Sequence, residues 1–307
     1  DDALRISEKT GGHNTFFLSS FYLGYCTSSS CEFERGIQHL NKMLEMSKVG
    51  RDLSNLSFIN GLTAYIYIYQ GRIDLAYQRS EESLRLAEKI GDMYVKGMAY
   101  SCYGASCYCK GLFDKAENSL SKAVTFCEKT THFTWGALAS SFLGDIYVNR
   151  REYRRSQDQY NKAISFLRSC SYCPSWINLE ELSVARAKIL SGDQDIDRST
   201  LFKYHETNRI KIYEGLVARY TGEILLNLDD QNLSEAEDWI RKAIETNKRN
   251  GMMFHLGQDY ALYAELFKRK SDKSKAKENL NKAIEIFKEC GADGWVEKYE
   301  KELAALS

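Results

Sequence analysis

The sequence predicts an all-α fold, a right-handed superhelical solenoid of antiparallel helix pairs that repeat every 40 residues. Proline occurs once in 307 residues, far below the usual ~5%. Because proline breaks helices, this scarcity favours long helices joined by short turns. Seven-residue phrases of nearly the same form return at 120–126, 160–166, 240–246 and 280–286. Such a fixed period is the signature of a repeat architecture.

Small residues recur in register with this period. Three columns of them, spaced within each 40-residue row, are Gly24, Ala64, Gly104, Gly144 and Ala264; then Gly36, Ala76, Ala116, Ser156, Ala236 and Ala276; then Ala123, Ala163, Ala243 and Ala283. Where two helices cross closely, a larger side chain would push their axes apart. The columns therefore predict that each helix pair presents the same face to the next, which builds one continuous core.

Each row is expected to hold two helices. Residues 93–111 and 253–269 exemplify the first helix of a row, and 113–129 and 273–289 exemplify the second. In the last of these ranges, apolar residues step by three and four along one face, namely Ala276, Leu280, Ala283, Ile284 and Phe287. The run YIYIY at 65–69 favours a strand when taken alone, but the repeat context predicts a helix there.

The 40-residue period predicts that residues 1–307 form a single solenoid. The expected units are an incomplete first repeat at 1–12, repeats at about 13–50, 51–91, 92–131 and 132–172, a degenerate unit at 173–212, repeats at 213–251 and 252–291, and a solvent-facing capping helix at 292–307. The degenerate unit holds the one proline, Pro174, and is expected to form helices at 177–190 and about 198–212. Both a structural irregularity and a functional insertion remain open for it.

The spacing of small and bulky residues resembles the tetratricopeptide family. Its clearest instances are the runs at 110–126 and 143–166. Two features depart from that family: the period is 40 rather than ~34, and the proline that commonly closes the second helix is missing. Longer helices of this kind resemble the helical arms of large bacterial signalling ATPases.

The run at 233–303 resembles the C-terminal tail of bacterial class III adenylate cyclases that carry an ATPase module and helical repeats. No cyclase or ATPase motif occurs in this chain. The resemblance therefore implies that such catalysis would lie on upstream sequence of a larger signalling protein.

Composition narrows the functional class. The 42 basic and 42 acidic residues cancel, which argues against a nucleic-acid partner. No apolar run reaches the ~20 residues of a membrane span, and no signal peptide opens the chain. Nine cysteines, an odd and scattered set, fit reduced thiols in a cytoplasmic protein.

The sequence offers no catalytic residue, cofactor site or metal site, and we expect no enzymatic activity. Cys170 and Cys173 form a CxxC without a second pair of metal ligands at suitable spacing. The five histidines are dispersed, and no phosphate-binding glycine motif occurs.

The best candidate site is the concave face. In the tetratricopeptide family the first helix of each repeat lines that face, and the positions projected there are Tyr25, Tyr65, Tyr69, Tyr108, Asp145 and Asn149. Tyrosine gives a large contact area and a hydroxyl, which suits recognition. Packing within the core is an equal expectation for each tyrosine.

The leading functional hypothesis is a non-catalytic module that binds a protein segment, or upstream domains of its parent, in an open groove. One alternative is a small-molecule sensor, which requires a closed pocket with convergent polar groups. Another is a self-association scaffold, in the simplest case a homodimer, which requires an exposed apolar patch.

Overall fold

The computed structural model describes residues 13–170 and 173–306, and every regular element in these ranges is a helix. The α-helices are α2 (His13–Ser29), α3 (Phe33–Gly50), α4 (Leu53–Gln70), α5 (Ile73–Ile90), α6 (Met93–Lys110), α7 (Phe113–Thr130), α8 (Phe133–Asn149), α9 (Tyr153–Ser169), α10 (Pro174–Leu190), α11 (Arg198–Thr207), α12 (Glu214–Leu228), α13 (Leu233–Arg249), α14 (Met253–Arg269), α15 (Lys273–Cys290) and α16 (Asp293–Ala304). Two short 3-10 helices, η1 (Lys211–Tyr213) and η2 (Asp230–Asn232), precede α12 and α13. The all-α solenoid of antiparallel pairs is confirmed. The expected segment at 1–12 lies outside the described residues.

Local sequence signals set the helix ends. Asp52 and Asp92 precede α4 and α6, and their carboxylates accept hydrogen bonds from the backbone N–H groups of Asn55 and Val95. Gly71 and Gly111 follow the same two helices in the left-handed conformation, which glycine adopts without strain. The YIYIY run lies within α4, so the helix predicted there is confirmed.

The small residues lie where paired helices cross. A Cβ added at Gly104 would lie 2.5 Å from Leu120 Cγ, and one at Gly144 would lie 2.4 Å from Tyr160 Cε1. Such contacts are far below van der Waals distance, so a larger residue would separate α6 from α7 and α8 from α9. This is the packing that the columns predicted.

The irregular unit consists of α10, the short α11 and η1. Pro174 is the first residue of α10, where its missing N–H costs no helical hydrogen bond. The second expected helix, about 198–212, ends earlier, at Thr207, and the chain continues in extended conformation before η1.

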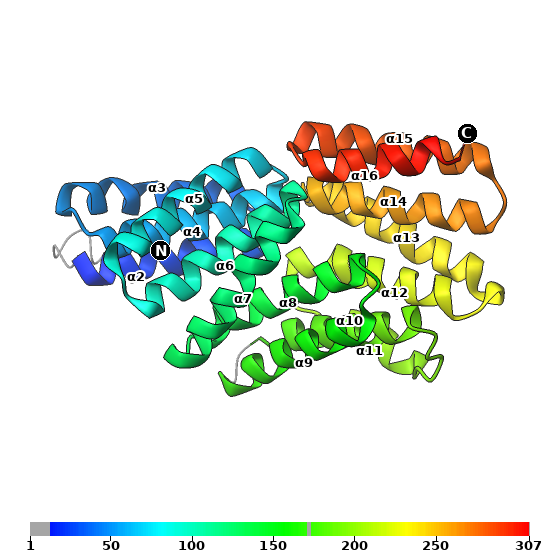
Figure 1. The fold of residues 1–307 in the computed structure, drawn as a ribbon, viewed down its shortest axis with the longest axis horizontal. Coiled ribbons are helices and arrows are strands. Elements are labelled where there is room, and N and C mark those ends of the chain that lie inside the picture. The colour runs from blue at the N-terminus through cyan, green and yellow to red at the C-terminus, as the bar shows by residue number, and fades with distance from the viewer. Residues whose placement is uncertain (1–12, 171–172, 307) are drawn as a thin grey trace.

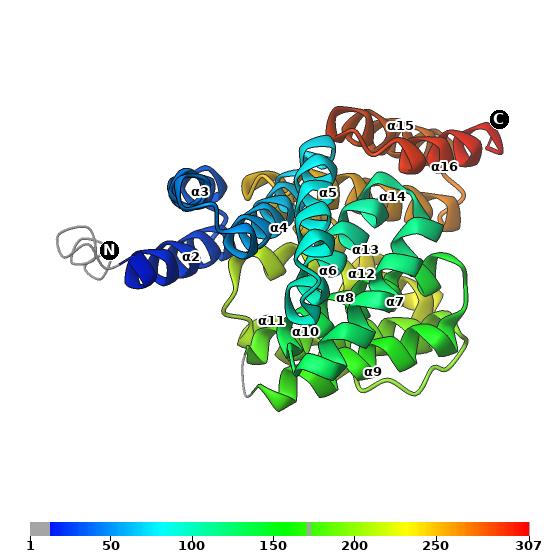
Figure 2. The same cartoon turned by 60° about the vertical axis from the view of Figure 1, so that its left-hand side comes forward.

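The superhelix curls until its last helices meet its first ones (Figures 1 and 2). In Figure 1 the red end of the chain, α15 and α16, lies beside the cyan helices α5 and α6. Contacts join α14 to α4 and α16 to α6. The superhelix is therefore a ring whose two sides are in contact.

We call the contact between the start of α16 and the end of α6 the seam. Trp295 is 2% exposed, and its indole N–H donates to the carbonyl oxygen of Tyr108 over 2.9 Å. The ammonium of Lys110 binds the carboxylates of Asp74 at 2.7 Å and Asp293 at 2.8 Å. The seam thus combines a buried aromatic anchor with charge pairing.

Two glycines let the backbones touch at the seam. A Cβ added at Gly111 would lie 2.5 Å from the Cα of Gly294, and one at Gly294 would lie 2.8 Å from the Cα of Gly111. Neither side can yield, because both contacts are with backbone atoms. The expected capping helix therefore does more than face solvent: it closes the ring.

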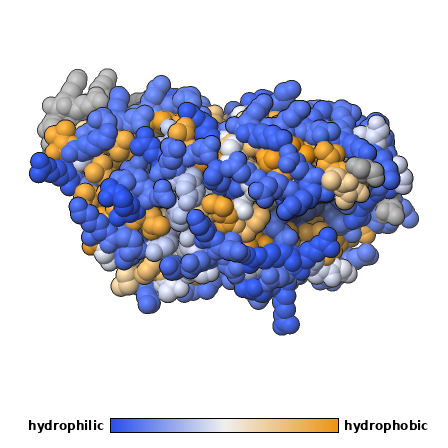
Figure 3. Space-filling view, turned by 45° about the horizontal axis from the view of Figure 1, so that its top comes forward, coloured by the Kyte–Doolittle hydropathy of each residue, from blue (hydrophilic) through white to orange (hydrophobic). Residues whose placement is uncertain are grey.

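The face of the molecule seen in Figure 3 is mainly hydrophilic, with apolar residues in separate groups. None of the helices within 13–170 and 173–306 is both long and apolar enough to span a bilayer. At the turns between helices, Arg150 pairs with Asp114 and Glu117, and Lys270 pairs with Glu237.

We predict that Gly294→Ala opens the ring. The new Cβ would overlap the backbone of Gly111, and overpacking of this kind costs about 1–3 kcal/mol. Small-angle X-ray scattering should show a larger radius of gyration, and urea unfolding should show lower stability.

Gly50→Ala is the matched control, because Gly50 ends α3 with no atom within 4 Å of an added Cβ. It should leave the scattering curve unchanged. Wild-type scattering and stability for Gly294→Ala would contradict the role assigned to the seam.

Candidate functional site

The inner faces of the helices line a central cavity of about 640 Å³ that is partly open to solvent. Its walls come from the even-numbered helices α4 to α16, together with Arg151 of the α8–α9 turn, Tyr153 and Tyr160 of α9, and Tyr213 of η1. The last helix supplies Trp295, Lys298, Tyr299 and Glu302. The helix that closes the ring is thus also a wall of the cavity.

Five of the six residues predicted from the sequence line this cavity: Tyr65, Tyr69, Tyr108, Asp145 and Asn149. The sixth, Tyr25, lies on α2 and packs against the apolar core, outside the cavity lining. It belongs to the first described pair, which stands at the beginning of the superhelix.

Tyr65 and Tyr69 of α4 are buried and also line the cavity. Tyr65 and Tyr69 are 8% and 7% exposed, and their hydroxyl groups hydrogen-bond to each other. The ring of Tyr65 also packs edge-on against Trp135 at 6.2 Å between ring centroids. Burial raises the pKa of both phenols, so they stay neutral and present hydroxyl groups to the cavity.

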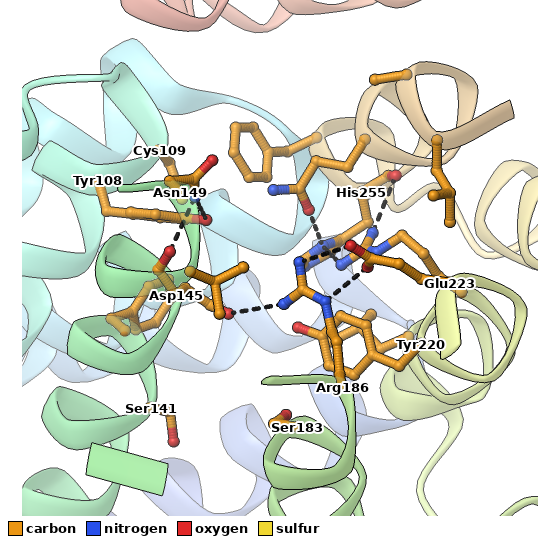
Figure 4. A pocket seen from close by; sticks show the side chains of 18 of the residues that line it. Tyr108, Cys109, Ser141, Asp145, Asn149, Ser183, Arg186, Tyr220, Glu223 and His255 are labelled. Carbon is orange, nitrogen blue, oxygen red and sulfur yellow. Dashed lines mark hydrogen bonds and ion pairs between the residues drawn. The ribbon is translucent and has the colours of Figure 1, made fainter. Parts of the chain in front are cut away.

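An ion-pair network crosses the cavity wall (Figure 4). Arg186 of α10 lies between Glu223 of α12, at 2.6 Å, and Asp145 of α8, at 3.6 Å. Asp145 also accepts a hydrogen bond from the hydroxyl of Tyr160 over 2.7 Å. Burial raises the pKa of Asp145 although Arg186 and this hydrogen bond act to lower it.

A second ion pair lies deeper. The guanidinium of Arg219, 6% exposed, contacts the fully buried Asp259 at 3.2 Å. Asp259 also accepts a hydrogen bond from the Asn247 amide at 2.6 Å, and burial raises its pKa to about 6. Burial next to Arg219 lowers the pKa of His255 to about 3, so this imidazole is neutral at physiological pH.

Glu180 of α10 is a buried carboxyl group without a cation. It is 3% exposed, and its Oε1 accepts hydrogen bonds from the Ser141 hydroxyl at 2.6 Å and the Trp176 indole at 2.9 Å. Burial raises its pKa to about 8, against these two hydrogen bonds, and the nearby Asp145 raises it further.

Sequence reasoning missed the charged residues of the second half, including Glu180, Arg186, Arg219, Glu223 and Lys298. The 40-residue period predicts a small residue at position 224. The small residue that contacts the partner helix is instead Gly222, where an added Cβ would lie 2.8 Å from Ile240. Glu223 directly follows Gly222, as Asp145 directly follows Gly144. Shifting the repeat alignment by two residues after the irregular unit would therefore have aligned Glu223 with Asp145.

Within 13–170 and 173–306, no group of three or more His, Cys, Asp or Glu side chains is arranged to hold a metal ion. Cys170 and Cys173 are partly buried. Cys102, Cys107, Cys109, Cys127 and Cys290 are buried, and burial raises the pKa of each thiol.

No protein-family model matches the chain, and a search of curated proteins returns no significant match. Three solved structures have similar folds at 12–13% sequence identity. The apo form of RapI has a TM-score of 0.61, with 88% of this chain and 97% of that chain covered. Aspartyl phosphate phosphatase F from Bacillus subtilis gives 0.63, with 92% and 73% covered. A Rap protein complexed with Competence and Sporulation Factor gives 0.53, with 96% and 77% covered.

At this level of identity the likeness concerns the fold alone. It supports the tetratricopeptide-like helical-repeat architecture predicted from the sequence. The resemblance to the tails of adenylate cyclases and signalling ATPases finds no counterpart in these comparisons.

We predict that Glu180→Gln stabilises the protein at pH 8 but not at pH 4. The folded state keeps the Glu180 proton up to a pKa of about 8, whereas the unfolded chain releases it near the ordinary value of 4.5. The stability linked to this group is thus present below pH 4.5 and is lost as pH rises to about 8. Because one pKa unit corresponds to about 1.4 kcal/mol, urea unfolding at pH 8 should show a gain of at least about 1 kcal/mol.

Glu181→Gln is the control, because Glu181 is the next residue of α10 and its carboxylate already pairs with Arg168 of α9. It should show no such gain. Equal stability of Glu180→Gln and wild type at pH 8 would contradict the burial penalty.

We also predict that Asp259→Ala lowers the free energy of unfolding by about 3–5 kcal/mol, because it leaves the buried Arg219 guanidinium without a counter-charge. The exposed pair of Arg85 and Glu82 provides the comparison, and Glu82→Ala should cost at most about 1 kcal/mol. Chemical unfolding of both variants measures the difference; similar losses would contradict the buried charge pairing.

Proposed function

We propose that this protein is a non-catalytic regulatory module that binds a ligand in its central cavity and responds by stabilising the closed ring. The observation that supports this most is that α16 both closes the ring and lines the cavity. A volume of about 640 Å³ falls within the usual range for ligand sites, ~300–1,000 Å³. The convergent polar groups that line this cavity favour the sensor hypothesis.

The proposed coupling follows from the positions of side chains on α16. Lys298 and Tyr299 face the cavity, while Trp295, one turn earlier, anchors the seam. A ligand that contacts Lys298 or Tyr299 makes these contacts only when the ring is closed, so it stabilises the closed ring relative to the open one. Because a ligand shifts an equilibrium only by its differential affinity, this contact would favour closure.

A non-catalytic role is supported by how the charged groups are fixed. Arg186 and Arg219 are held by Glu223 and Asp259, so these groups act as structural supports of the wall. One structural neighbour is named a phosphatase, but 12% identity carries no activity over to this chain.

We further propose that the response is passed to protein partners, such as upstream domains of a cytoplasmic signalling protein. The resemblance of residues 233–303 to the tails of adenylate cyclases motivates that parent. A neighbouring fold has been solved complexed with Competence and Sporulation Factor, which supports a regulatory use of this architecture. No contact in the structure favours a homodimer specifically.

Native mass spectrometry tests the proposal. The wild-type protein should carry a mass that leaves on denaturation, or acquire one from the low-molecular-mass fraction of a cell extract, and Gly294→Ala should retain less of it. A wild-type chain at its bare mass in both conditions, with an unchanged melting temperature, would overturn the proposal.

A further inference from the structure

The cavity wall holds one carboxyl group that lacks a counter-charge. The carboxylates lining the cavity are Asp145, Glu180, Glu223, Glu265 and Glu302. Four of them pair with Arg186 or Lys268. Glu180 forms no ion pair with any residue of the described chain. Its Oε2 atom is also buried without a hydrogen-bond partner.

The unpartnered oxygen is held in a fixed position. Two donors, the Ser141 hydroxyl and the Trp176 indole N–H, both bind Oε1, which leaves Oε2 free. Among the buried side-chain atoms without a partner in the described residues, Oε2 of Glu180 is the one that belongs to a residue lining this cavity. An orphaned buried acceptor of this kind calls for an explanation, such as a missing ligand.

The surroundings suit a cation. The indole N–H of Trp176 donates to Glu180. Further aromatic side chains line the same cavity, contributed by α4, η1 and α12; they are Tyr69, Tyr213 and Tyr220. The rings of Trp176 and Tyr213 are 6.5 Å apart. Aromatic faces attract a desolvated cation, and a carboxylate adds direct charge pairing.

We propose that Glu180 is the receptor for a positively charged nitrogen, an ammonium or guanidinium, on the ligand of the central cavity. This deepens the proposed function and rests on it. The ligand cation supplies the counter-charge that the other four carboxylates obtain from the protein. Its binding displaces the proton that Glu180 otherwise keeps, since burial holds the Glu180 pKa at about 8.

The far side of the cavity offers the opposite charge. Lys298 forms no ion pair with the described residues, and its ammonium donates to the Asn149 side-chain oxygen at 2.7 Å. Asn149 and Ser141 lie on the same face of α8, eight residues apart, a rise of roughly 12 Å. A ligand that reaches both groups would therefore carry its nitrogen and an anionic group at about that separation.

Two probes cover the sources of such a nitrogen. 1,5-Diaminopentane represents a free organic amine, with 1,5-pentanediol as its uncharged counterpart. Tetra-alanine represents a peptide amino group with a carboxylate about 13 Å away, at ~3.3 Å per extended residue. N-acetyl-tetra-alanine keeps the carboxylate but lacks the cation.

Isothermal titration calorimetry of the full chain at pH 7 tests the proposal. At least one of the two cationic probes should bind, its counterpart without the cation should bind at least tenfold more weakly, and Glu180→Gln should weaken binding of the cationic probe by a similar factor. Glu181→Gln should bind as wild type does. Because Glu180→Gln is expected to be stable, lost binding would not reflect unfolding.

Proton release on binding is a second measurement, and it would not change in Glu180→Gln if Glu180 had only a structural role. Titrations of whichever cationic probe binds, in buffers of different ionisation enthalpy, should show release of up to one proton at pH 7 in wild type and none in Glu180→Gln. If diaminopentane binds, its affinity should fall up to tenfold per pH unit below about 8, because its amines stay charged throughout. The other titratable groups around Glu180 are Asp145, which pairs with Arg186, and tyrosines that burial keeps neutral, namely Tyr69, Tyr213 and Tyr220.

The outcomes separate this inference from the proposed function. Equal binding to wild type and Glu180→Gln, or no binding of either cationic probe, would overturn the inference. If the protein still carries a mass by native mass spectrometry in that case, the cavity is a ligand site of different chemistry and the proposed function stands.

Discussion

The contact between the start of α16 and the end of α6 is the constraint on which the cavity depends. Trp295 fills a space among the rings of Tyr108, Phe113, Phe254 and Phe287, at 5.4–5.9 Å between centroids. Removing a buried tryptophan of this kind typically costs about 3–5 kcal/mol. The backbone contact of Gly111 with Gly294 then brings the two helices close enough for the Lys298 ammonium to reach Asn149. Without this seam the inner face would be an open groove.

Burial governs the electrostatics of the inner face. It raises the pKa values of Glu180 and Asp259 and lowers the pKa of His255. The ring offsets most of this penalty by pairing charges across helices, as in Arg186 with Glu223. At Glu180 no counter-charge from the described residues offsets the cost of burying the carboxylate. A positively charged ligand group could supply that counter-charge.

The features that could be predicted from the sequence are those whose contacts lie within one repeat. The helices, their turns and the close crossings at Gly104 and Gly144 depend on contacts within one repeat, and the repeat period carries that information. Tyr65, Tyr108 and Asp145 could be placed on the inner face for the same reason. The seam could not be predicted, because Trp295 and Tyr108 are 187 residues apart. Whether the two ends meet depends on the summed curvature of all the repeats, including the irregular α10–α11 unit, which also displaced the register that would have indicated Glu223.

Hydrogen exchange of the amides in α16, residues 296–301, tests the closed ring most directly. A closed seam predicts that these amides are protected to the same degree as those of α6, because opening either helix would require the same contacts to break. If α16 exchanges rapidly, as a frayed terminal helix does, while α15 stays protected, then the ring is open in solution. The cavity would then be a groove, and the proposed coupling of ligand binding to closure would be wrong.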